Sequence, residues 1–341
     1  MKIGLVGYGV GGQSFHAPYI DAAEGAELAG IVTRSPEKRA LAAAHFPGVP
    51  LFGSLAELID SGVDAVTITT PPETRQELVL EAIARGIHVI ADKPFAVDAA
   101  RGAELVAAAE QAGVALDVFH NRRWDTDIRT LKSVIDSGAV GEVARFESRF
   151  DLDQPHLLDA GPAGGLLRDI GSHLVDQAVW LFGPAATVYA TLDYVDLPAG
   201  RTDCGFLITI KHVSGVASLV SSTKTRRFTH RELRILGTEG SCISEQSDVQ
   251  ASAIFAGQLP KNNKSSWGFE AEERWATLHT AAGTTRVPSE QGAYYRYYEQ
   301  FVRAIKGRDE HPVTGTDALQ TLRILDAARL SDAQNRVIHL P

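Results

Sequence analysis

The feature that most constrains this chain is a glycine pattern placed directly after its first apolar run. Gly7, Gly9 and Gly12 follow residues 3–6 with the spacing G-x-G-x-x-G. Glycine suits such a turn because the turn is tight, the backbone must approach a pyrophosphate, and the next helix packs close to the strand. The pattern predicts a dinucleotide site formed by Gly7, Tyr8, Gly9, Val10, Gly11 and Gly12. The alternative is a tight turn that binds no ligand.

Short apolar runs recur along the first third of the chain. They cover residues 3–6, 28–33, 65–70, 88–91 and 114–119, and helical patterns lie between them, for example at residues 73–85 and 99–111. Continuously apolar strands joined by helices are typical of a parallel sheet with both faces covered. We therefore expect an N-terminal, doubly wound Rossmann domain over residues 1–120.

The pattern changes after about residue 120. An amphipathic helix is expected at residues 125–137, and alternating strands follow at residues 205–211, 216–225, 232–236 and 275–280. Period-two alternation is typical of an antiparallel sheet with one exposed face. Two helices, at residues 293–306 and 317–332, close the chain. The fold class is thus α/β, with a second α/β domain over residues 121–341.

Composition and charge exclude several classes of protein. The 341 residues are 44% hydrophobic, which is enough for two domains with cores. The net charge is −9, and no basic cluster is interleaved with aromatics, so we expect no nucleic-acid partner. No apolar run approaches the roughly 20 residues of a membrane helix, and no signal peptide is recognisable. We expect no membrane partner and a cytoplasmic location.

The end of the second strand bears on which dinucleotide is bound. An NAD site usually carries an acidic residue there for the ribose 2′-hydroxyl, but this chain has Thr33, Arg34 and Ser35, with Lys38 and Arg39 close behind. Arginine can bind a 2′-phosphate bidentately and stack on adenine. We therefore favour NADP over NAD. The alternative is that these are ordinary solvated residues at the start of a helix.

Two further strand ends fall at the carboxyl edge of the expected sheet, where ligands bind in such folds. Thr70, Pro71 and Pro72 end the third apolar run, and Asp92 and Lys93 precede a proline at the end of the fourth. Lys93 is expected to point into the ligand crevice, beside the nicotinamide end of the dinucleotide. A surface lysine before a turn is the common alternative.

A polar pair interrupts an apolar helical pattern near the middle of the chain. Asp169 and His173 are one helical turn apart, and Asp176 and Gln177 extend the same side. A carboxylate beside an imidazole suits proton transfer near neutral pH. The alternative is a structural pair on a helix surface. No third ligand has a suitable spacing, so we expect no metal. The apolar face comprises Leu167, Ile170, Leu174, Ala178 and Leu181.

The segment after the fifth strand combines Asn121, Arg122, Arg123 and Trp124. Such side chains could clamp hydroxyl groups or a phosphate at the ligand edge, and the alternative is an interdomain cluster of salt bridges. His16, close behind the glycine turn, either faces the crevice or is a buried structural histidine.

In this order, the motifs resemble the Gfo/Idh/MocA oxidoreductase family, named for glucose–fructose oxidoreductase and inositol dehydrogenase, over essentially the whole chain. The resemblance is carried by the glycine turn, by Asp92-Lys93-Pro94, and by Gly164-Gly165 through Asp169 and His173. The runs Phe15-His16-Ala17-Pro18 and 119–125 look closest to the scyllo-inositol dehydrogenase-like branch. Two positions depart from the family pattern: Asp92 replaces a glutamate, and Arg75 replaces a histidine.

The resemblance implies that the second domain contains a large, open, mainly antiparallel sheet that supports homodimers or homotetramers. It implies that Lys93 contacts the reacting hydroxyl, that His173 is the proton donor or acceptor, and that Asp169 positions His173. Asn121 and Arg122 would line the cofactor site. The implied substrate-binding residues are His16, Lys93, Asn121, Arg123, Trp124, Asp169 and His173.

The activity implied by the resemblance is that of an NAD(P)-dependent oxidoreductase. It would transfer a hydride between the nicotinamide and a hydroxyl or ketone carbon of a small polyol, inositol or sugar. Two alternatives stay open, because a fold does not determine a function. One is a glycosidase-like enzyme that uses bound NAD transiently, and the other is a dinucleotide-binding sensor without catalytic activity.

Overall fold

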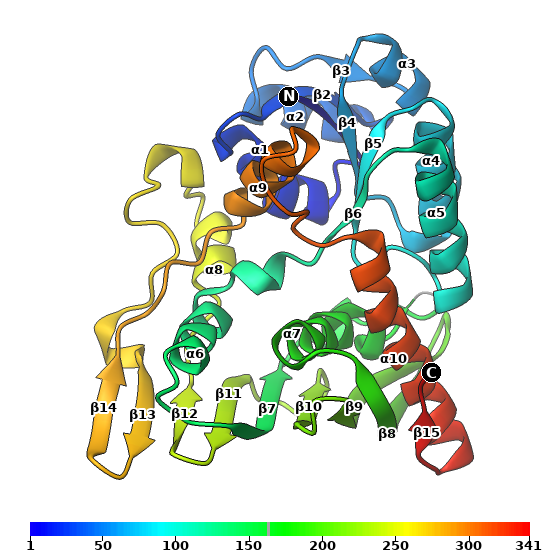
Figure 1. Ribbon diagram of the computed structural model, residues 1–341. Coiled ribbons are helices and arrows are strands. Elements are labelled where there is room, and N and C mark those ends of the chain that lie inside the picture. Colours follow the sequence, from blue (N-terminus) through cyan, green and yellow to red (C-terminus); the bar gives the residue numbers. More distant parts are fainter. Residues whose placement is uncertain (162–163) are drawn as a thin grey trace. The chain divides into compact units, whose positions relative to one another are not determined.

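The computed structural model describes residues 1–161 and 164–341, which divide into two compact units (Figure 1). Unit 1 comprises Met1–Asn121, Gln250–Trp267 and Ala293–Leu319. Unit 2 comprises Arg122–Val249, Gly268–Gly292 and Gln320–Pro341. The domain boundary expected after residue 120 stays a prediction. No helix in the described part of the chain is long and apolar enough to cross a bilayer.

Unit 1 is built on a six-stranded parallel sheet with the order β3-β2-β1-β4-β5-β6. This is the doubly wound order of a Rossmann domain, so the expected fold is confirmed. The strands, which have mostly buried side chains, are β1 (Lys2–Val6), β2 (Glu27–Val32), β3 (Leu51–Phe52), β4 (Ala65–Ile68), β5 (His88–Asp92) and β6 (Leu116–Phe119). The sequence pattern did not reveal β3, because its two residues are too few to form a periodic run.

The helices that begin in unit 1 connect these strands or return to them late in the chain. They are α1 (Ala17–Ala22), α2 (Pro36–His45), α3 (Leu55–Asp60), α4 (Pro72–Ala84), α5 (Ala99–Ala112), α9 (Tyr295–Ile305) and α10 (Gly315–Gln334). A short helix, α8 (Val249–Phe255), lies at a boundary between the units. Figure 1 shows α4 and α5 side by side along the sheet. The candidate site residues of unit 1 lie mainly in the turns that follow the carboxyl ends of these strands.

Unit 2 is built on a nine-stranded sheet with the order β14-β13-β12-β11-β7-β10-β9-β8-β15. Of the strand pairs described, β7 with β10 is parallel, and the others are antiparallel. The strands are β7 (Val143–Asp151), β8 (Ala185–Leu197), β9 (Gly200–His212), β10 (Ala217–Thr223), β11 (His230–Gly237), β12 (Gly240–Ser244), β13 (Ala276–Thr280), β14 (Gly283–Val287) and β15 (Ile338–His339). The expected large, mainly antiparallel sheet is confirmed.

One face of this sheet is covered by helices. The helices α6 (Thr126–Asp136) and α7 (Ser172–Phe182) lie over the same face (Figure 1). On β9, Phe206, Ile208 and Ile210 are buried, whereas Leu207 and Lys211 are exposed. The alternation follows from the pleat, because successive side chains of a strand point to opposite faces.

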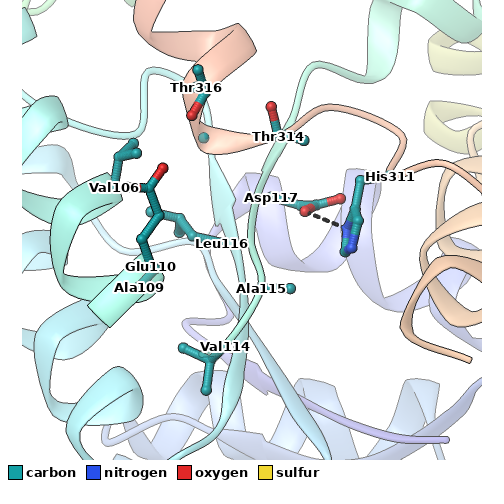
Figure 2. Close-up of a pocket in the computed structure, with 11 residues that line it drawn as sticks. Val106, Ala109, Glu110, Val114, Ala115, Leu116, Asp117, His311, Thr314 and Thr316 are labelled. Carbon is teal, nitrogen blue, oxygen red and sulfur yellow. Dashed lines mark hydrogen bonds and ion pairs between the residues drawn. The ribbon is translucent and has the colours of Figure 1, made fainter. Parts of the chain in front are cut away.

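A polar pair joins β6 to the segment before α10, within unit 1. The amide of Val118 donates to the carbonyl oxygen of Val313 (2.9 Å), and the buried Asp117 is hydrogen-bonded to His311 Nδ1 (2.8 Å; Figure 2). A pocket of about 230 Å³, lined in part by Asp117, His311 and Thr314, lies beside the pair. Burial raises the pKa of Asp117 to about 6, although the hydrogen bond to His311 opposes this shift. The same hydrogen bond raises the pKa of His311.

Both groups therefore hold protons more tightly in the folded chain than in the unfolded chain. The stabilising contribution of Asp117 is fully present below the ordinary pKa of an aspartate and is lost as the pH rises through about 6. The contribution of His311 is present below its ordinary pKa of 6.5 and is lost only as the pH rises through its raised pKa. Relative to Asp117→Asn, the wild type should lose about 2–3 kcal/mol of unfolding free energy between pH 4 and pH 7. Urea unfolding of both proteins across this range measures the unfolding free energy of the wild type minus that of the variant. A value that rises with pH would contradict the prediction.

Candidate functional site

The glycine turn at the end of β1 has the backbone geometry that a dinucleotide requires. Gly7 has a φ of +102°, a conformation that side chains disfavour, and its amide donates to the carbonyl oxygen of Val32 (3.0 Å). A Cβ atom on Gly12 would lie 2.3 Å from the carbonyl oxygen of Gly7. By contrast, a Cβ atom on Gly9 would meet no atom within 4 Å. The bare backbone of Gly9 thus faces open space, which is the room that a pyrophosphate needs.

The residues between and after these glycines differ in what they offer a ligand. The Tyr8 ring is buried, its hydroxyl lies 3.0 Å from His45 Nδ1, and burial raises its pKa to about 12. Tyr8 therefore offers only its main chain at the turn, whereas Val10 is 67% exposed. Residues Gly11–His16 form a π-helical turn before α1. Such turns are rare and are frequent at functional sites.

The end of β2 separates one structural arginine from one that is exposed. Arg39 donates to the carbonyl oxygens of Thr33 and Phe52 (3.2 Å each), so it ties the ends of β2 and β3 together. Ser35 caps α2, because its hydroxyl accepts from the amide of Lys38 (3.4 Å). Arg34 is exposed, and its guanidinium makes no hydrogen bond or ion pair with any described residue. Arg34 is therefore available to an anionic group.

Arg75, in the first turn of α4, holds together the turns that follow β4 and β5. Its buried guanidinium donates to the carbonyl oxygens of Thr70, Asp92 and Pro94. Burial lowers the pKa of Arg75, although the nearby Asp92 opposes this effect. The hydroxyl of Thr70 is buried without a hydrogen-bond partner among the described residues, and Pro71 and Pro72 are at least partly exposed. Sequence reasoning noted Arg75 only as a departure from a family pattern and missed this role.

Asp92 is the centre of a charged group in unit 1. Its Oδ1 atom accepts from the amide of Lys93 (2.8 Å) and lies 3.5 Å from His16 Nε2. Burial alone would raise the pKa of Asp92, but the charges of His16, Arg75 and Lys93 lower it to about 2. His16 is fully buried and lies 2.6 Å from the Tyr298 hydroxyl. His16 thus occupies the core of unit 1, one of the two placements expected, and its contact with a substrate stays a prediction.

In unit 2, a buried carboxylate fixes the start of the helical segment that carries Asp169 and His173. Asp203 on β9 accepts from the amide of Leu167 (2.6 Å) and pairs with Arg329 (3.0 Å). A carboxylate at a helix start satisfies an otherwise unpaired amide and complements the helix dipole. A Cβ atom on Gly165 would lie 2.3 Å from Asp203 Oδ1, and Gly165 has a φ of +96°. Glycine before this helix is therefore required by the approach of Asp203.

Asp169 and His173 lie on this one segment, but its first turn is not a regular α-helix. Residues Leu167–Gly171 form a π-helical turn, and α7 continues from Ser172. His173 is buried, whereas the side chain of Asp169 is 46% exposed. The Nζ atom of Lys224, just after β10, lies 2.9 Å from Asp169 Oδ2. Lys224 was missed, although alternation along the expected strand at residues 216–225 places it on the same face as Val220.

Asp176 and Gln177 hold α7 in place within unit 2. Arg123 donates two hydrogen bonds to Asp176 (Nε–Oδ2 2.8 Å; Nη2–Oδ1 2.7 Å), and both side chains are buried. Gln177 Nε2 donates to the carbonyl oxygen of Arg122 (2.9 Å). A bidentate arginine–carboxylate pair fixes orientation as well as distance. The polar stripe expected from the sequence therefore contains two residues that anchor the helix.

Arg122 belongs to a buried charge cluster in the same unit. It pairs with Asp125 (2.9 Å) and Asp248 (2.8 Å), and Arg231 pairs with Asp125 and Asp127 (2.6 Å each). Burial opposes the charge of Arg231, but Asp127 and Asp125 hold its pKa above the ordinary value. These salt bridges all lie within unit 2, whereas the alternative interpretation described an interdomain cluster.

Two neighbours of these arginines, Asn121 and Trp124, are also buried. The expected ligand contacts of Asn121, Arg122, Arg123 and Trp124 stay predictions.

One group of possible metal ligands occurs in the described part of the chain, and it does not include Asp169 or His173. His230 and Glu232 on β11 and Glu245 after β12 offer ligand atoms that lie within 4.8 Å of one another. Glu232 is already paired with Arg234 (3.4 Å). The expectation that the chain uses no metal stays a prediction.

Comparisons with known proteins cover both units. A family model described as "Oxidoreductase family, NAD-binding Rossmann fold" (GFO_IDH_MocA) matches residues 1–120, and its "C-terminal alpha/beta domain" matches residues 132–340. Oxidoreductase YdgJ of Escherichia coli is 33% identical, over 96% of this chain and 94% of its own length. The scyllo-inositol 2-dehydrogenase (NADP(+)) IolW of Bacillus subtilis is 31% identical, over 100% of this chain and 96% of its own length.

Solved structures agree with this relationship. The oxidoreductase yvaA from Bacillus subtilis is similar with a TM-score of 0.90 at 30% identity, over 100% of this chain and 98% of its own. Similarity of this extent covers the glycine turn of unit 1 and the helical segment of unit 2 together.

Two alanine substitutions in the glycine turn should separate ligand binding from folding. Gly9→Ala should keep its unfolding free energy within about 0.5 kcal/mol of wild type and weaken dinucleotide binding at least about tenfold. The reason is that the added methyl group fills the space open to the pyrophosphate. Gly12→Ala should lose about 1–3 kcal/mol of stability, because the methyl group meets the Gly7 carbonyl. Urea unfolding and dinucleotide titration measure the two effects, and equal binding by Gly9→Ala and wild type would contradict the assignment.

Proposed function

Because this chain belongs to the Gfo/Idh/MocA oxidoreductase family, we propose that it transfers a hydride between a nicotinamide dinucleotide and a small polyol, inositol or sugar. The reacting carbon would carry a hydroxyl or a ketone group. The observation that carries the proposal is the open backbone at Gly9. The resemblance of the motifs around Lys93, Asp169 and His173 to those of the family supports it. The name of IolW, a scyllo-inositol 2-dehydrogenase, supports the substrate class.

The proposed roles follow from the chemistry of each side chain. In the oxidation direction, an imidazole nitrogen of His173 accepts the hydroxyl proton, and Asp169 positions His173. Lys93 Nζ donates a hydrogen bond to the reacting oxygen and stabilises its developing negative charge. When bound, the nicotinamide supplies the hydride acceptor or donor, which no protein side chain can provide.

We propose that the preferred cofactor is NADP(H) rather than NAD(H). Arg34, just after β2, and Lys38, in the first turn of α2, are exposed, and no carboxylate stands at residues 33–35 to repel a 2′-phosphate. A guanidinium recognises a phosphate bidentately, which is more specific than a lysine contact. The relative IolW is a scyllo-inositol 2-dehydrogenase (NADP(+)), which supports the same preference.

We also propose that the open face of the unit 2 sheet pairs with a second copy of this chain, to form a homodimer or homotetramer. Tyr189 and Leu207 are exposed on this face, and a hollow of about 360 Å³ lies among Leu207, Glu147 and Arg234. Alternating charges of both signs suit a self-complementary contact. Light scattering tests the expected mass. The cytoplasmic location and the absence of nucleic-acid and membrane partners stay predictions.

A spectrophotometric screen tests the activity. Polyols, inositols and sugars are offered with NADP⁺ and NAD⁺ in parallel, and substrate-dependent absorbance of the reduced nicotinamide is the expected result. His173→Ala should lower kcat about 10²–10⁴-fold and still bind NADPH, because it removes the proton acceptor alone. Full turnover by this variant would refute the role of His173. A silent panel with tight dinucleotide binding would instead favour the glycosidase-like enzyme or the sensor.

Arg34→Gln tests the cofactor preference. We expect the KM for NADPH to rise about 10–100-fold, because a charge-assisted contact to the 2′-phosphate is lost, while the KM for NADH changes less than about twofold. Arg101→Gln is the matched control, since Arg101 is an exposed arginine on α5 that pairs with Glu104 (2.9 Å). Equal effects of Arg34→Gln on both cofactors would show that Arg34 does not read the phosphate.

A further inference from the structure

Lys224 is a buried cation that the proposed roles leave unused. Its side chain is 4% exposed, and its Nζ atom lies 2.9 Å from Asp169 Oδ2 and 3.4 Å from the carbonyl oxygen of Leu157. Its own amide donates to the carbonyl oxygen of Cys204 (3.0 Å), so the main chain is held against β9. A buried ammonium is costly unless it is paired, and Asp169 is its counter-ion.

The other carboxylates and cations near this segment already have partners. Asp203 pairs with Arg329 (3.0 Å), Asp176 with Arg123 (2.7 Å), and Arg168 with Asp326 (3.9 Å). The other charged or titratable groups on β7, on β9 and in the loop before Gly161 are Arg145, Glu147, Arg149, Asp151, Asp153, His156, Asp159, Arg201, Cys204, Lys211 and His212. In the pair of Lys224 and Asp169, the cation is buried and the carboxylate is 46% exposed.

The positive charge of Lys224 weakens the electrostatic effect of the Asp169 carboxylate on the protonation of His173. A carboxylate alone would stabilise the charged imidazolium, which could not accept a proton from a hydroxyl group. With the ammonium 2.9 Å away, the carboxylate stays ionised, and its negative charge is largely neutralised. His173 is buried, and burial by itself favours a neutral imidazole.

We propose that Lys224 is a positioning residue that keeps Asp169 ionised and in place, and thereby keeps His173 neutral and ready to accept a proton. The inference rests on the proposed function, in which Asp169 and His173 handle the hydroxyl proton. Lys224 acts through Asp169 and needs no contact with the substrate.

Lys224→Met in the full chain tests this directly, because methionine keeps the apolar stem and removes the charge. Proton NMR follows the titration of the His173 imidazole, assigned by its loss in His173→Gln, without substrate or cofactor. We expect the midpoint to move about one pH unit or more to higher pH, because the unneutralised carboxylate then favours the imidazolium. Lys224→Arg should restore the wild-type midpoint. Lys211→Met, which removes an exposed lysine on β9, should leave it unchanged.

The pH profile of kcat/KM gives a second measurement. The acid limb for substrate oxidation should move to higher pH in Lys224→Met, with about a tenfold loss at a fixed acidic pH for each unit of movement. The reason is that the unneutralised carboxylate of Asp169 keeps His173 protonated up to a higher pH. A purely structural role would lower stability and leave the limb where it is.

The outcomes separate this inference from the proposed function. A shifted His173 titration in a chain that oxidises no polyol would refute the proposed function and support the role of Lys224. An unmoved titration in Lys224→Met, or an Arg variant that behaves like the Met variant, would overturn the inference even if the enzyme oxidises polyols. If Lys224→Met does not fold, Lys224→Gln decides, because glutamine keeps a hydrogen-bond donor without the charge.

Discussion

The contact between the backbone of Gly12 and the carbonyl oxygen of Gly7 is the constraint on which unit 1 depends. A single Cβ atom at residue 12 would come within 2.3 Å of that oxygen. The helical turn can therefore pack this close to the end of β1 only if residue 12 is a glycine. In the same turn, a Cβ atom on Gly9 would meet no atom within 4 Å. Close packing and ligand access therefore have one cause, which is the absence of side chains at this turn.

Unit 2 positions the segment that carries Asp169 and His173 through one hydrogen bond and two ion pairs, each made by a carboxylate. Asp203 holds the first turn, Arg123 holds Asp176 on α7, and Lys224 holds Asp169. Each pair is at least partly buried, where electrostatic interactions are stronger than in water but an unpaired charge would be costly. The arrangement holds the segment at three points and leaves the side chain of Asp169 46% exposed. Fixed support around one accessible polar group suits the proton transfer that we propose.

The outline of both units could be predicted from the sequence, whereas several contacts could not. The two sheets left different patterns in the sequence. Strands that are buried on both faces are continuously apolar, as in unit 1, whereas strands with one exposed face alternate between apolar and polar residues, as in unit 2. Arg75 gave no such signal, since its partners are the carbonyl oxygens of Thr70, Asp92 and Pro94, which any residues would supply. The π-helical turn at Leu167–Gly171 was also invisible, because helical spacing in a sequence does not distinguish a π turn from an α turn.

By itself, the sequence determined the fold class, the glycine turn and the residue types available for proton transfer. These depend on local rules: the period of apolar residues, the spacing of glycines, and the chemistry of side chains. Only the tertiary structure decided which charges meet. Lys224 and Asp169 are separated by 55 residues, and their side chains lie 2.9 Å apart. They meet because the helical segment packs against the sheet at β10. A pairing that depends on distant segments leaves no local pattern for the sequence to display.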